Sequence, residues 1–358
     1  MVGVERERAV VAAAQPAELR VGVVGAGYWG PNLVRNFFEA PGSTVVAASD
    51  LSLERLAAIG RRYPTLPLTT DVADILRDPR GDAVALATPT ATHYALARRA
   101  LEAGKHVWVE KPLAPSYAEA MRLTELAHRQ GLTLMVDHTF VYTGAVQAMR
   151  TRIDTGELGE LLYYDSVRVN LGLYQNDVNV IWDLGIHDVS IVDYLLPFRP
   201  IAVSAQGARH IGSGDGVSES IAYVTLHYEQ NFIAHFHVNW LAPVKIRMAT
   251  LCGADRMIVY DDMVLSEKLR IYDRGVTVNG DAESDRRRLL VEYRSGDMYA
   301  PRVDPAEALQ TGARHFAASI AAGTAPLTDG LAGSRAVAML EAAQQSLANS
   351  GRVTRISW

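Results

Sequence analysis

Three glycines near the N-terminus have the spacing of a loop that holds phosphates. Gly25, Gly27 and Gly30 follow an apolar run and open an amphipathic stretch, in the pattern G-x-G-x-x-G. The first glycine permits a tight turn, the second lets the backbone approach a pyrophosphate, and the third lets helix and strand pack closely. The free N–H groups of the helix N-terminus attract the phosphates. We therefore predict a dinucleotide site here, with Tyr28 and Trp29 among its contacts.

Asp50 stands twenty residues after Gly30, at the end of the next apolar run. A carboxylate at this place accepts hydrogen bonds from the ribose hydroxyls of NAD and repels the 2′-phosphate of NADP. Leu51 and Ser52 follow it and carry no charge that would offset the repulsion. Arg55 lies one helical turn further on and could assist NADP. We predict NAD in preference to NADP.

Polar residues also follow the later apolar runs. Ligands of doubly wound sheets lie beyond the carboxyl ends of the strands, so such residues should border the cofactor. This rule selects Thr88, Pro89, Thr90, His93, Glu110, Lys111 and His138. Helix capping is an alternative for Thr90, a solvent-facing or capping role for His93, and loop capping for His138.

Lys111 is the residue in this group that could act on a substrate. It follows Glu110 and precedes Pro112. A side-chain ammonium at a strand end can donate a hydrogen bond to a hydroxyl or carbonyl oxygen in the cleft. The alternative is a surface lysine before a proline turn, and the position at a strand end favours the first interpretation.

A second dense polar cluster contains Trp182, Asp183 and His187. On an α-helix Asp183 and His187 are four residues apart and lie on one face. A carboxylate beside an imidazole can fix its tautomer and raise its basicity, which suits a base that removes an alcohol proton. A solvated face of an amphipathic helix explains the pair equally well.

The remaining histidines do not indicate a metal site. His235 and His237 alternate in one apolar run and His227 lies in its neighbour, but no cysteine or evident carboxylate completes a ligand set. We predict no metal.

The composition excludes several classes of protein. The formal net charge is -5 and the 35 lysines and arginines form no long run, so we expect no nucleic-acid partner. No segment approaches the roughly 20 apolar residues of a membrane span, so we expect no membrane partner. Cys252 is the single cysteine, which excludes an internal disulfide and fits a reducing, cytoplasmic compartment.

The first third of the chain has the rhythm of a parallel sheet. Short apolar runs without strict alternation suit strands that are buried on both faces, and amphipathic stretches between them suit crossover helices. We predict strands at 19–24, 44–49, 83–87, 106–110 and 132–136, and helices at 32–40, 52–62, 92–103 and 116–130. Gly104 and Gly131 fit helix C-caps. The predicted fold of residues 19–140 is an α/β Rossmann domain, a doubly wound parallel sheet.

The pattern changes after about residue 140. A helix at 144–155 precedes longer, alternating runs, and the short connection at 229–231 suits a hairpin. We predict strands within 161–170, 218–229, 231–241, 245–253 and 255–262, and closing helices at 305–322 and 331–349. Residues 141–358 should form an α+β domain with an open, mostly antiparallel sheet, and residues 1–18 a flexible tail.

Together these segments resemble the Gfo/Idh/MocA family of oxidoreductases. The resemblance rests on GAGYWG, the strand end at Asp50, ATPTATH, EKP, the Asp183–His187 pair and the closing TDGLAGSRAVAMLEAAQQS, and covers about residues 18–358. GYWGPNLVRNF, DHTFVY and NDVNVIWDLGIHDVSI are most similar to the branch that acts at C3 of nucleotide-linked sugars.

The resemblance implies roles for individual residues. Lys111 would be the catalytic lysine, His187 the base and Asp183 a support for the substrate, while Trp182 would contact the cofactor. Lysine as the base with histidine as its orienter stays open. The open sheet of this family often mediates homodimers or homotetramers.

The function implied is hydride transfer between a sugar carbinol or ketone, at C3 of a nucleotide-linked sugar, and the nicotinamide of NAD(P). The alternatives are an inositol or free-sugar dehydrogenase, a non-catalytic NAD-binding sensor, and a glycosidase that uses tightly held NAD. A nucleotide diphosphate needs cations, for which Arg168, Lys245 and Arg247 are candidates, although they could equally be ordinary surface residues.

Overall fold

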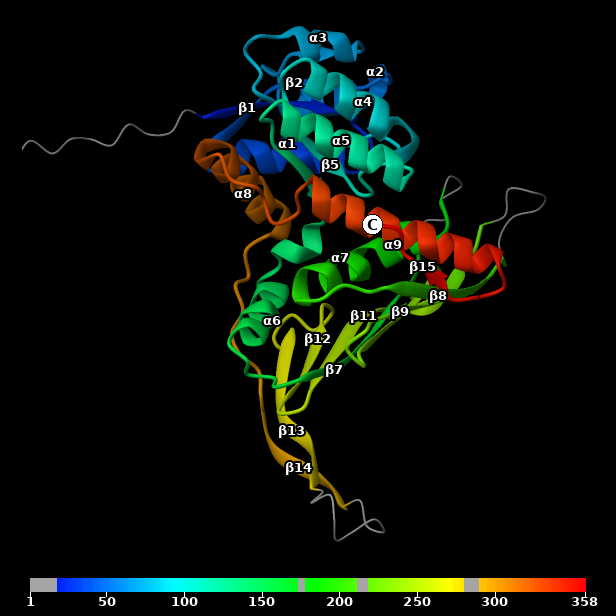
Figure 1. The fold of residues 1–358 in the computed structure, drawn as a ribbon. Coiled ribbons are helices and arrows are strands. Elements are labelled where there is room, and N and C mark those ends of the chain that lie inside the picture. Colours follow the sequence, from blue (N-terminus) through cyan, green and yellow to red (C-terminus); the bar gives the residue numbers. More distant parts are fainter. Residues whose placement is uncertain (1–17, 173–177, 211–217, 280–289) are drawn as a thin grey trace, which may run out of the picture.

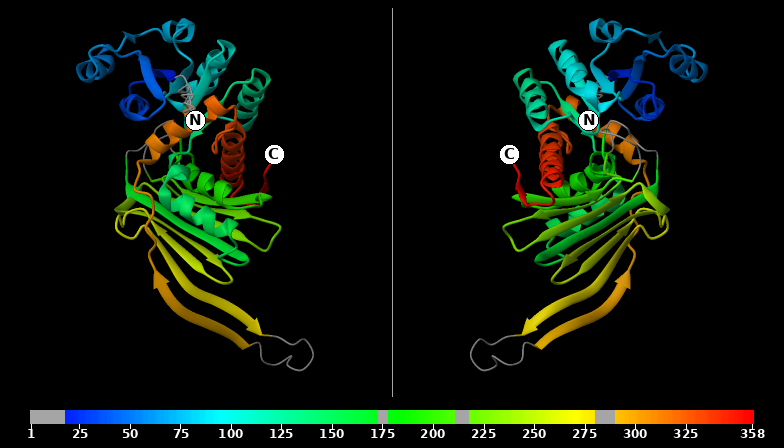
Figure 2. Two further views of the ribbon diagram at one scale, coloured as in Figure 1. Left: turned by 90° about the vertical axis from the view of Figure 1, so that its left-hand side faces the viewer. Right: turned by 90° about the vertical axis from the view of Figure 1, so that its right-hand side faces the viewer.

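The computed structural model describes residues 18–172, 178–210, 218–279 and 290–358. A parallel sheet forms one half of the molecule and a larger, mostly antiparallel sheet forms the other, with helices α7 and α9 between them (Figures 1 and 2). The predicted fold class is therefore confirmed. Nearly all of the predicted tail, 1–18, lies outside the described residues.

The first sheet has six parallel strands in the order β3-β2-β1-β4-β5-β6. Apart from β3, most of their apolar residues are buried on both faces, as expected for strands covered by crossover helices. The strands are β1 (Leu19–Val24), β2 (Ser43–Ser49), β3 (Leu68–Thr69), β4 (Ala83–Leu86), β5 (His106–Glu110) and β6 (Leu134–Asp137). β3 was not predicted, because two residues cannot give a recognisable apolar run.

The helices of this half begin and end at residues whose chemistry explains the boundary. Ser52, Asp71 and Ser116 accept N–H groups of the first turns of α2, α3 and α5. Gly104 and Gly131 have φ of 75° and 66°, which confirms the predicted C-caps. The helices are α1 (Gly30–Glu39), α2 (Leu53–Arg62), α3 (Val72–Arg77), α4 (Thr90–Glu102) and α5 (Tyr117–Arg129). The short helix α3 was not predicted.

The second sheet has nine strands in the order β14-β13-β12-β11-β7-β10-β9-β8-β15. The predicted hairpin is confirmed, since β9 and β10 pair antiparallel, whereas β10 and β7 pair in parallel. The strands are β7 (Leu161–Leu171), β8 (Ala202–Ala208), β9 (Ile221–His227), β10 (Ile233–Asn239), β11 (Leu241–Gly253), β12 (Met257–Asp261), β13 (Leu269–Asn279), β14 (Leu290–Tyr299) and β15 (Thr354–Arg355). One face packs on helices and the other, with Tyr163 and Tyr223, is partly exposed.

The second half of the chain contains several helices in addition to its sheet. They are α6 (Gly144–Asp154), α7 (Ile186–Leu195), α8 (Ala308–Ala322) and α9 (Gly330–Ala348), with the 3₁₀ turn η1 (Thr139–Tyr142) and the π-helical turn η2 (Ile181–Gly185). α8 returns to the first sheet, where Phe316 packs against Trp108 and Phe37. The division at residue 140 stays a prediction. Within the described ranges, no helix is long and apolar enough to cross a bilayer.

Candidate active site

A large cavity lies at the carboxyl ends of β1, β2 and β4. Its volume is about 900 Å³. Seven of the predicted cofactor residues line it: Gly25, Gly27, Tyr28, Trp29, Asp50, Thr88 and Pro89. This is the crevice in which doubly wound sheets bind dinucleotides.

The glycine loop that borders this cavity requires glycine at two positions. Gly25 has φ of 98°, and a Cβ there would lie 2.5 Å from the carbonyl oxygen of Ala87. A Cβ at Gly30 would overlap the carbonyl oxygen of Gly25. At Gly27 the space is open, and a Cβ would meet only the Arg55 side chain at 4.0 Å. The loop thus leaves its backbone accessible, as a pyrophosphate requires.

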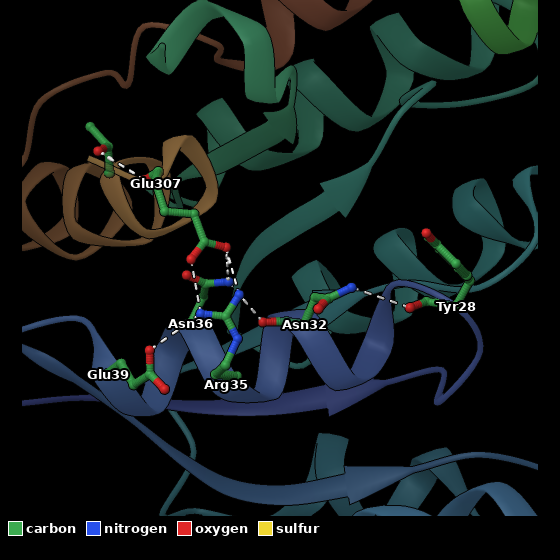
Figure 3. A network of polar contacts seen from close by, with 7 residues as sticks. Tyr28, Asn32, Arg35, Asn36, Glu39 and Glu307 are labelled. Carbon is green, nitrogen blue, oxygen red and sulfur yellow. Dashed lines mark hydrogen bonds and ion pairs between the residues drawn. The ribbon is translucent and has the colours of Figure 1, made fainter. Parts of the chain in front are cut away.

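Helix α1, which begins at this loop, is fixed against the segment that leads into α8. Arg35 donates to both carboxylate oxygens of Glu307, at 2.9 and 2.6 Å, and Asn36 donates to the same carboxylate at 3.1 Å (Figure 3). The carbonyl of Tyr28 accepts a bond from Asn32 at 3.4 Å. These contacts hold the helix N-terminus in place, while the Tyr28 ring remains 77% exposed.

Asp50 supports the glycine loop as well as lining the cavity. One carboxylate oxygen accepts the Ala26 N–H at 2.6 Å and the other accepts the Ser52 N–H at 2.8 Å. Arg55 comes within 3.9 Å of the same carboxylate. The negative charge therefore stands where the adenosine ribose of a dinucleotide would lie.

His93 is not the solvent-facing residue that was one alternative for it. The side chain is buried, and its ring nitrogens contact the carbonyl oxygens of Pro112 at 2.7 Å and Thr88 at 2.8 Å. It is neither a solvent-facing residue nor a contact of the cavity, but a link between the loops that follow β4 and β5. Burial lowers the pKa of this histidine, so the ring is neutral.

Lys111 and Asp183 form an ion pair between the two halves of the molecule. The lysine Nζ lies 3.1 Å from the Asp183 carboxylate and donates to the Asp183 carbonyl at 2.9 Å. The other carboxylate oxygen accepts the indole N–H of Trp240 at 3.0 Å. Asp183 thus contacts Lys111 and Trp240 instead of forming the expected contact with His187. The partner Trp240 lies between β10 and β11 and gave no signal in the sequence.

His187 follows the π-helical turn, at the start of α7. Its ring packs edge-on against Phe140, with centroids 4.9 Å apart, and its Nδ1 is buried without a hydrogen-bond partner among the described residues. Burial, together with the charges of Lys111 and Arg168, lowers the pKa of His187 well below its ordinary value. The imidazole is thus neutral and can accept a proton.

Glu110 and Asp137 occupy register-matched ends of the neighbouring strands β5 and β6. Both side chains are buried, and each carboxyl group interacts with the other and with the charge of Lys111. His138 follows Asp137, and neither of its ring nitrogens has a partner within the part of the chain that is described. Neither Glu110 nor His138 lines the large cavity, and His138 instead lines a separate cavity with Asp193 and Arg335. The position of ligands beyond strand ends predicted Glu110 and His138 as site residues, but it did not predict that Glu110 lies beside Asp137.

A second cavity, of about 340 Å³, adjoins the first at Ala91. Thr90 and Trp182, two of the predicted cofactor contacts, lie on its wall. The sequence gave no signal for the polar residues that complete it: Asn179, Arg209, Glu219 and Gln344. The side-chain amide of Asn179 donates to both Glu219 and Gln344, and its Oδ1 accepts backbone N–H groups of η2.

The three cationic residues considered as partners of a diphosphate have different surroundings. Arg168 is buried and ion-paired with Asp188 at 2.6 Å, and its guanidinium stacks on Phe140. Arg247 lies 3.5 Å from Asp262, while Lys245 is exposed. Arg168 is therefore not a surface residue.

The histidines of the open sheet contact hydroxyl groups and a ring. His227 contacts Ser204 and His235 contacts Thr225, each at 2.9 Å, and His237 stacks on Tyr223. Over the described ranges, no three metal-ligating side chains come together.

Two family descriptions match the chain. Residues 19–138 match the "Oxidoreductase family, NAD-binding Rossmann fold", and residues 146–259 match the "GFO/IDH/MocA C-terminal domain". The first of these places an NAD(P)-binding fold where the glycine loop and its cavity lie.

Similar proteins include the oxidoreductase YrbE of Bacillus subtilis, 26% identical over 61% of this chain and 66% of its own length. The scyllo-inositol 2-dehydrogenase (NAD(+)) of the same organism is 30% identical over 53% of this chain and 57% of its own. The chain thus spans less than two thirds of these two relatives. The structure of UDP-N-acetylglucosamine 3-dehydrogenase from Acidithiobacillus ferrooxidans shares the fold, with a TM-score of 0.77, 24% identity, and coverage of 94% of this chain and 99% of that one.

Proposed function

The chain belongs to the GFO/IDH/MocA family of oxidoreductases, and we propose that it oxidises a secondary alcohol of a sugar with NAD as the acceptor. The observation that carries this proposal is the ion pair between Lys111 and Asp183 beside a neutral His187. It brings a hydrogen-bond donor and a proton acceptor to the strand ends where a nicotinamide would lie.

The charges around the site suggest a division of roles between lysine and histidine. Lys111 is held by a carboxylate, so it suits an ammonium that donates to the substrate oxygen. His187 is uncharged and its Nδ1 has no hydrogen-bond partner in the described part of the chain, so it suits the base that takes the hydroxyl proton. Such a base contributes roughly 10²- to 10⁴-fold to the rate. Asp183 orients the ammonium rather than the imidazole.

The cofactor would be held by the glycine loop and Asp50. Gly25, Gly27 and the N-terminus of α1 would receive the pyrophosphate, and the Asp50 carboxylate the ribose. When bound, the nicotinamide supplies the acceptor for the hydride that leaves the carbinol carbon. Thr88 and Pro89 would border the nicotinamide end.

A nucleotide-linked sugar oxidised at C3 is the first candidate substrate. The UDP-N-acetylglucosamine 3-dehydrogenase of Acidithiobacillus ferrooxidans is 28% identical over 73% of this chain. The polar cavity beside Trp182 offers amide, carboxylate and guanidinium groups that can bind sugar hydroxyls.

A free cyclitol or sugar is the second candidate. One observation favours it: Arg168 and Arg247, considered for a diphosphate, are both engaged by carboxylates. A diphosphate would then have to compete with Asp262 for Arg247.

Incubation with NAD and a panel of alcohols tests the proposal. The panel contains UDP-N-acetylglucosamine, its uronate, scyllo-inositol, myo-inositol and glucose, and the readout is absorbance of the reduced nicotinamide. We expect one class to reduce NAD and K111A to abolish that reduction. No reduction with any member, together with NAD retained through purification, would favour a sensor instead.

A further inference from the structure

The buried carboxyl pair under the lysine loop has no part in the mechanism described so far. Glu110 and Asp137 are the last residues of adjacent parallel strands and stand in register. They are 8% and 2% exposed, and one carboxyl oxygen of Glu110 is buried without a hydrogen-bond partner among the residues described. The charge of Lys111, the residue that follows Glu110, acts on both carboxyl groups.

Two carboxylates in this position cannot both be charged. Burial penalises each charge and the two charges repel, so the pKa of Glu110 is raised well above its ordinary value and that of Asp137 to about 6. A hydrogen bond between two carboxyl groups also requires that one of them is protonated. The Thr139 hydroxyl donates to Asp137 at 2.7 Å, which favours the negative charge on Asp137 and the proton on Glu110.

We propose that Glu110 and Asp137 share a single proton and together act as a positioning pair for Lys111. The pair then carries one negative charge, and the Asp183 carboxylate, 3.1 Å from the lysine Nζ, supplies a second. This arrangement keeps Lys111 charged and aimed at the substrate oxygen. The inference rests on the proposed role of Lys111 as a donor.

The other groups around the pair leave this charge balance in place. From η1, the Tyr142 hydroxyl bonds Thr328, and burial raises the pKa of that tyrosine, so it is neutral. His138 is neutral because burial lowers its pKa to about 3. From α9, Arg335 is ion-paired with Asp193 at 2.7 Å. Lys111 is therefore the cation that the pair faces.

Infrared spectroscopy of the protein without substrate tests the shared proton directly. Wild type at pH 7 should show the carbonyl band of a buried carboxylic acid. E110Q should lack that band, because the glutamine amide cannot ionise and can donate a hydrogen bond to an ionised Asp137. D137N should keep the band at pH 7 and lose it at higher pH. E39Q, which removes an exposed carboxylate, should change nothing and serves as the control.

Turnover tests the positioning role. In E110Q the amide can still donate a hydrogen bond to Asp137, whose negative charge stays, so E110Q should lose less turnover at pH 7 than D137N. D137N should lose about tenfold at pH 7 and recover as Glu110 ionises at higher pH, whereas the double variant should stay impaired at every pH. Melting temperatures near that of wild type identify variants that fold.

Two results would overturn the inference. One is a wild-type spectrum without the acid band at pH 7. The other is an E110Q variant that folds but is as inactive as K111A. If no sugar is oxidised by the wild type, the proposed function fails, whereas the spectra still decide whether the pair holds a proton.

Discussion

The Asp183 carboxylate lies 3.1 Å from the Lys111 Nζ, and this contact joins residues that are 72 positions apart. Lys111 follows a strand of the first sheet, and Asp183 lies on the π-helical turn of the second half. The chemistry of the site therefore depends on how the two halves fit together. A change that separates them would release the lysine.

We expect K111A to lose about 10²- to 10⁴-fold in turnover, because no other cation described here is placed to donate to the substrate oxygen at this strand end. Binding of NADH should remain within a few-fold of wild type, since the glycine loop is untouched. Fluorescence titration and steady-state kinetics measure the two quantities. K245A, at an exposed lysine of β11, is the control. Full turnover by K111A would contradict the assignment.

His187 should act as a base over the whole neutral range. Burial and the nearby charge of Lys111 lower its pKa, so the competent neutral form persists until the pH falls well below 6.5. H187N should reduce kcat by at least about a hundredfold at every pH between 6.5 and 9. H128N, at an exposed position of α5, is the matched control. A wild-type profile that falls near pH 6.5 and loses this limb in H187N would contradict the expectation.

Asp50 should determine the choice between NAD and NADP. D50N keeps the shape of the side chain and one hydrogen-bond acceptor oxygen. It removes the negative charge of the carboxylate, which lies 3.9 Å from the Arg55 guanidinium. NADH should bind D50N more weakly and NADPH more strongly, and their ratio should shift by about tenfold or more. Parallel titrations of the two cofactors measure this ratio. An unchanged ratio would mean that Asp50 serves only the loop contacts with Ala26 and Ser52.

The sequence predicted those parts of the fold that have a clear apolar pattern. Continuous runs identified five strands of the first sheet, and alternation identified the hairpin of β9 and β10. β3 and β15 were missed because two residues carry no period. β8 was missed because small and polar residues, ending in Gln206, Gly207 and Ala208, make up much of it.

Site residues were predictable where the sheet topology fixes their position. They were not predictable where several side chains compete for one hydrogen-bond partner. The strand-end rule located Lys111 and Glu110. The α-helical spacing of Asp183 and His187 failed because a π-helical turn ends between them, so α-helical geometry does not hold across the pair. It failed also because Lys111, distant in sequence, attracts the carboxylate. A single sequence does not reveal that contact.

His138 should make the protein less stable in mild acid. Its pKa is lowered to about 3 by burial, whereas in the unfolded chain it is about 6.5. Below pH 6.5 the unfolded state therefore binds a proton that the folded state does not, and the free energy of unfolding decreases as the pH is lowered. H138L removes this penalty. The unfolding free energy of H138L minus that of wild type should therefore be about 2 kcal/mol larger at pH 5 than at pH 7. Urea titrations at the two pH values measure the difference, and a constant difference would contradict it.

Arg168 and Asp188 should behave as a buried structural ion pair rather than as a ligand site. The two side chains are 5% and 4% exposed, and the guanidinium also stacks on Phe140 at 4.3 Å. D188N leaves an uncompensated buried charge and should lower the unfolding free energy by about 3–5 kcal/mol. The double variant R168M/D188L removes both charges and should recover most of that loss, as urea unfolding can measure. If D188N were instead as stable as wild type and weakened only UDP-sugar binding, Arg168 would belong to a diphosphate site.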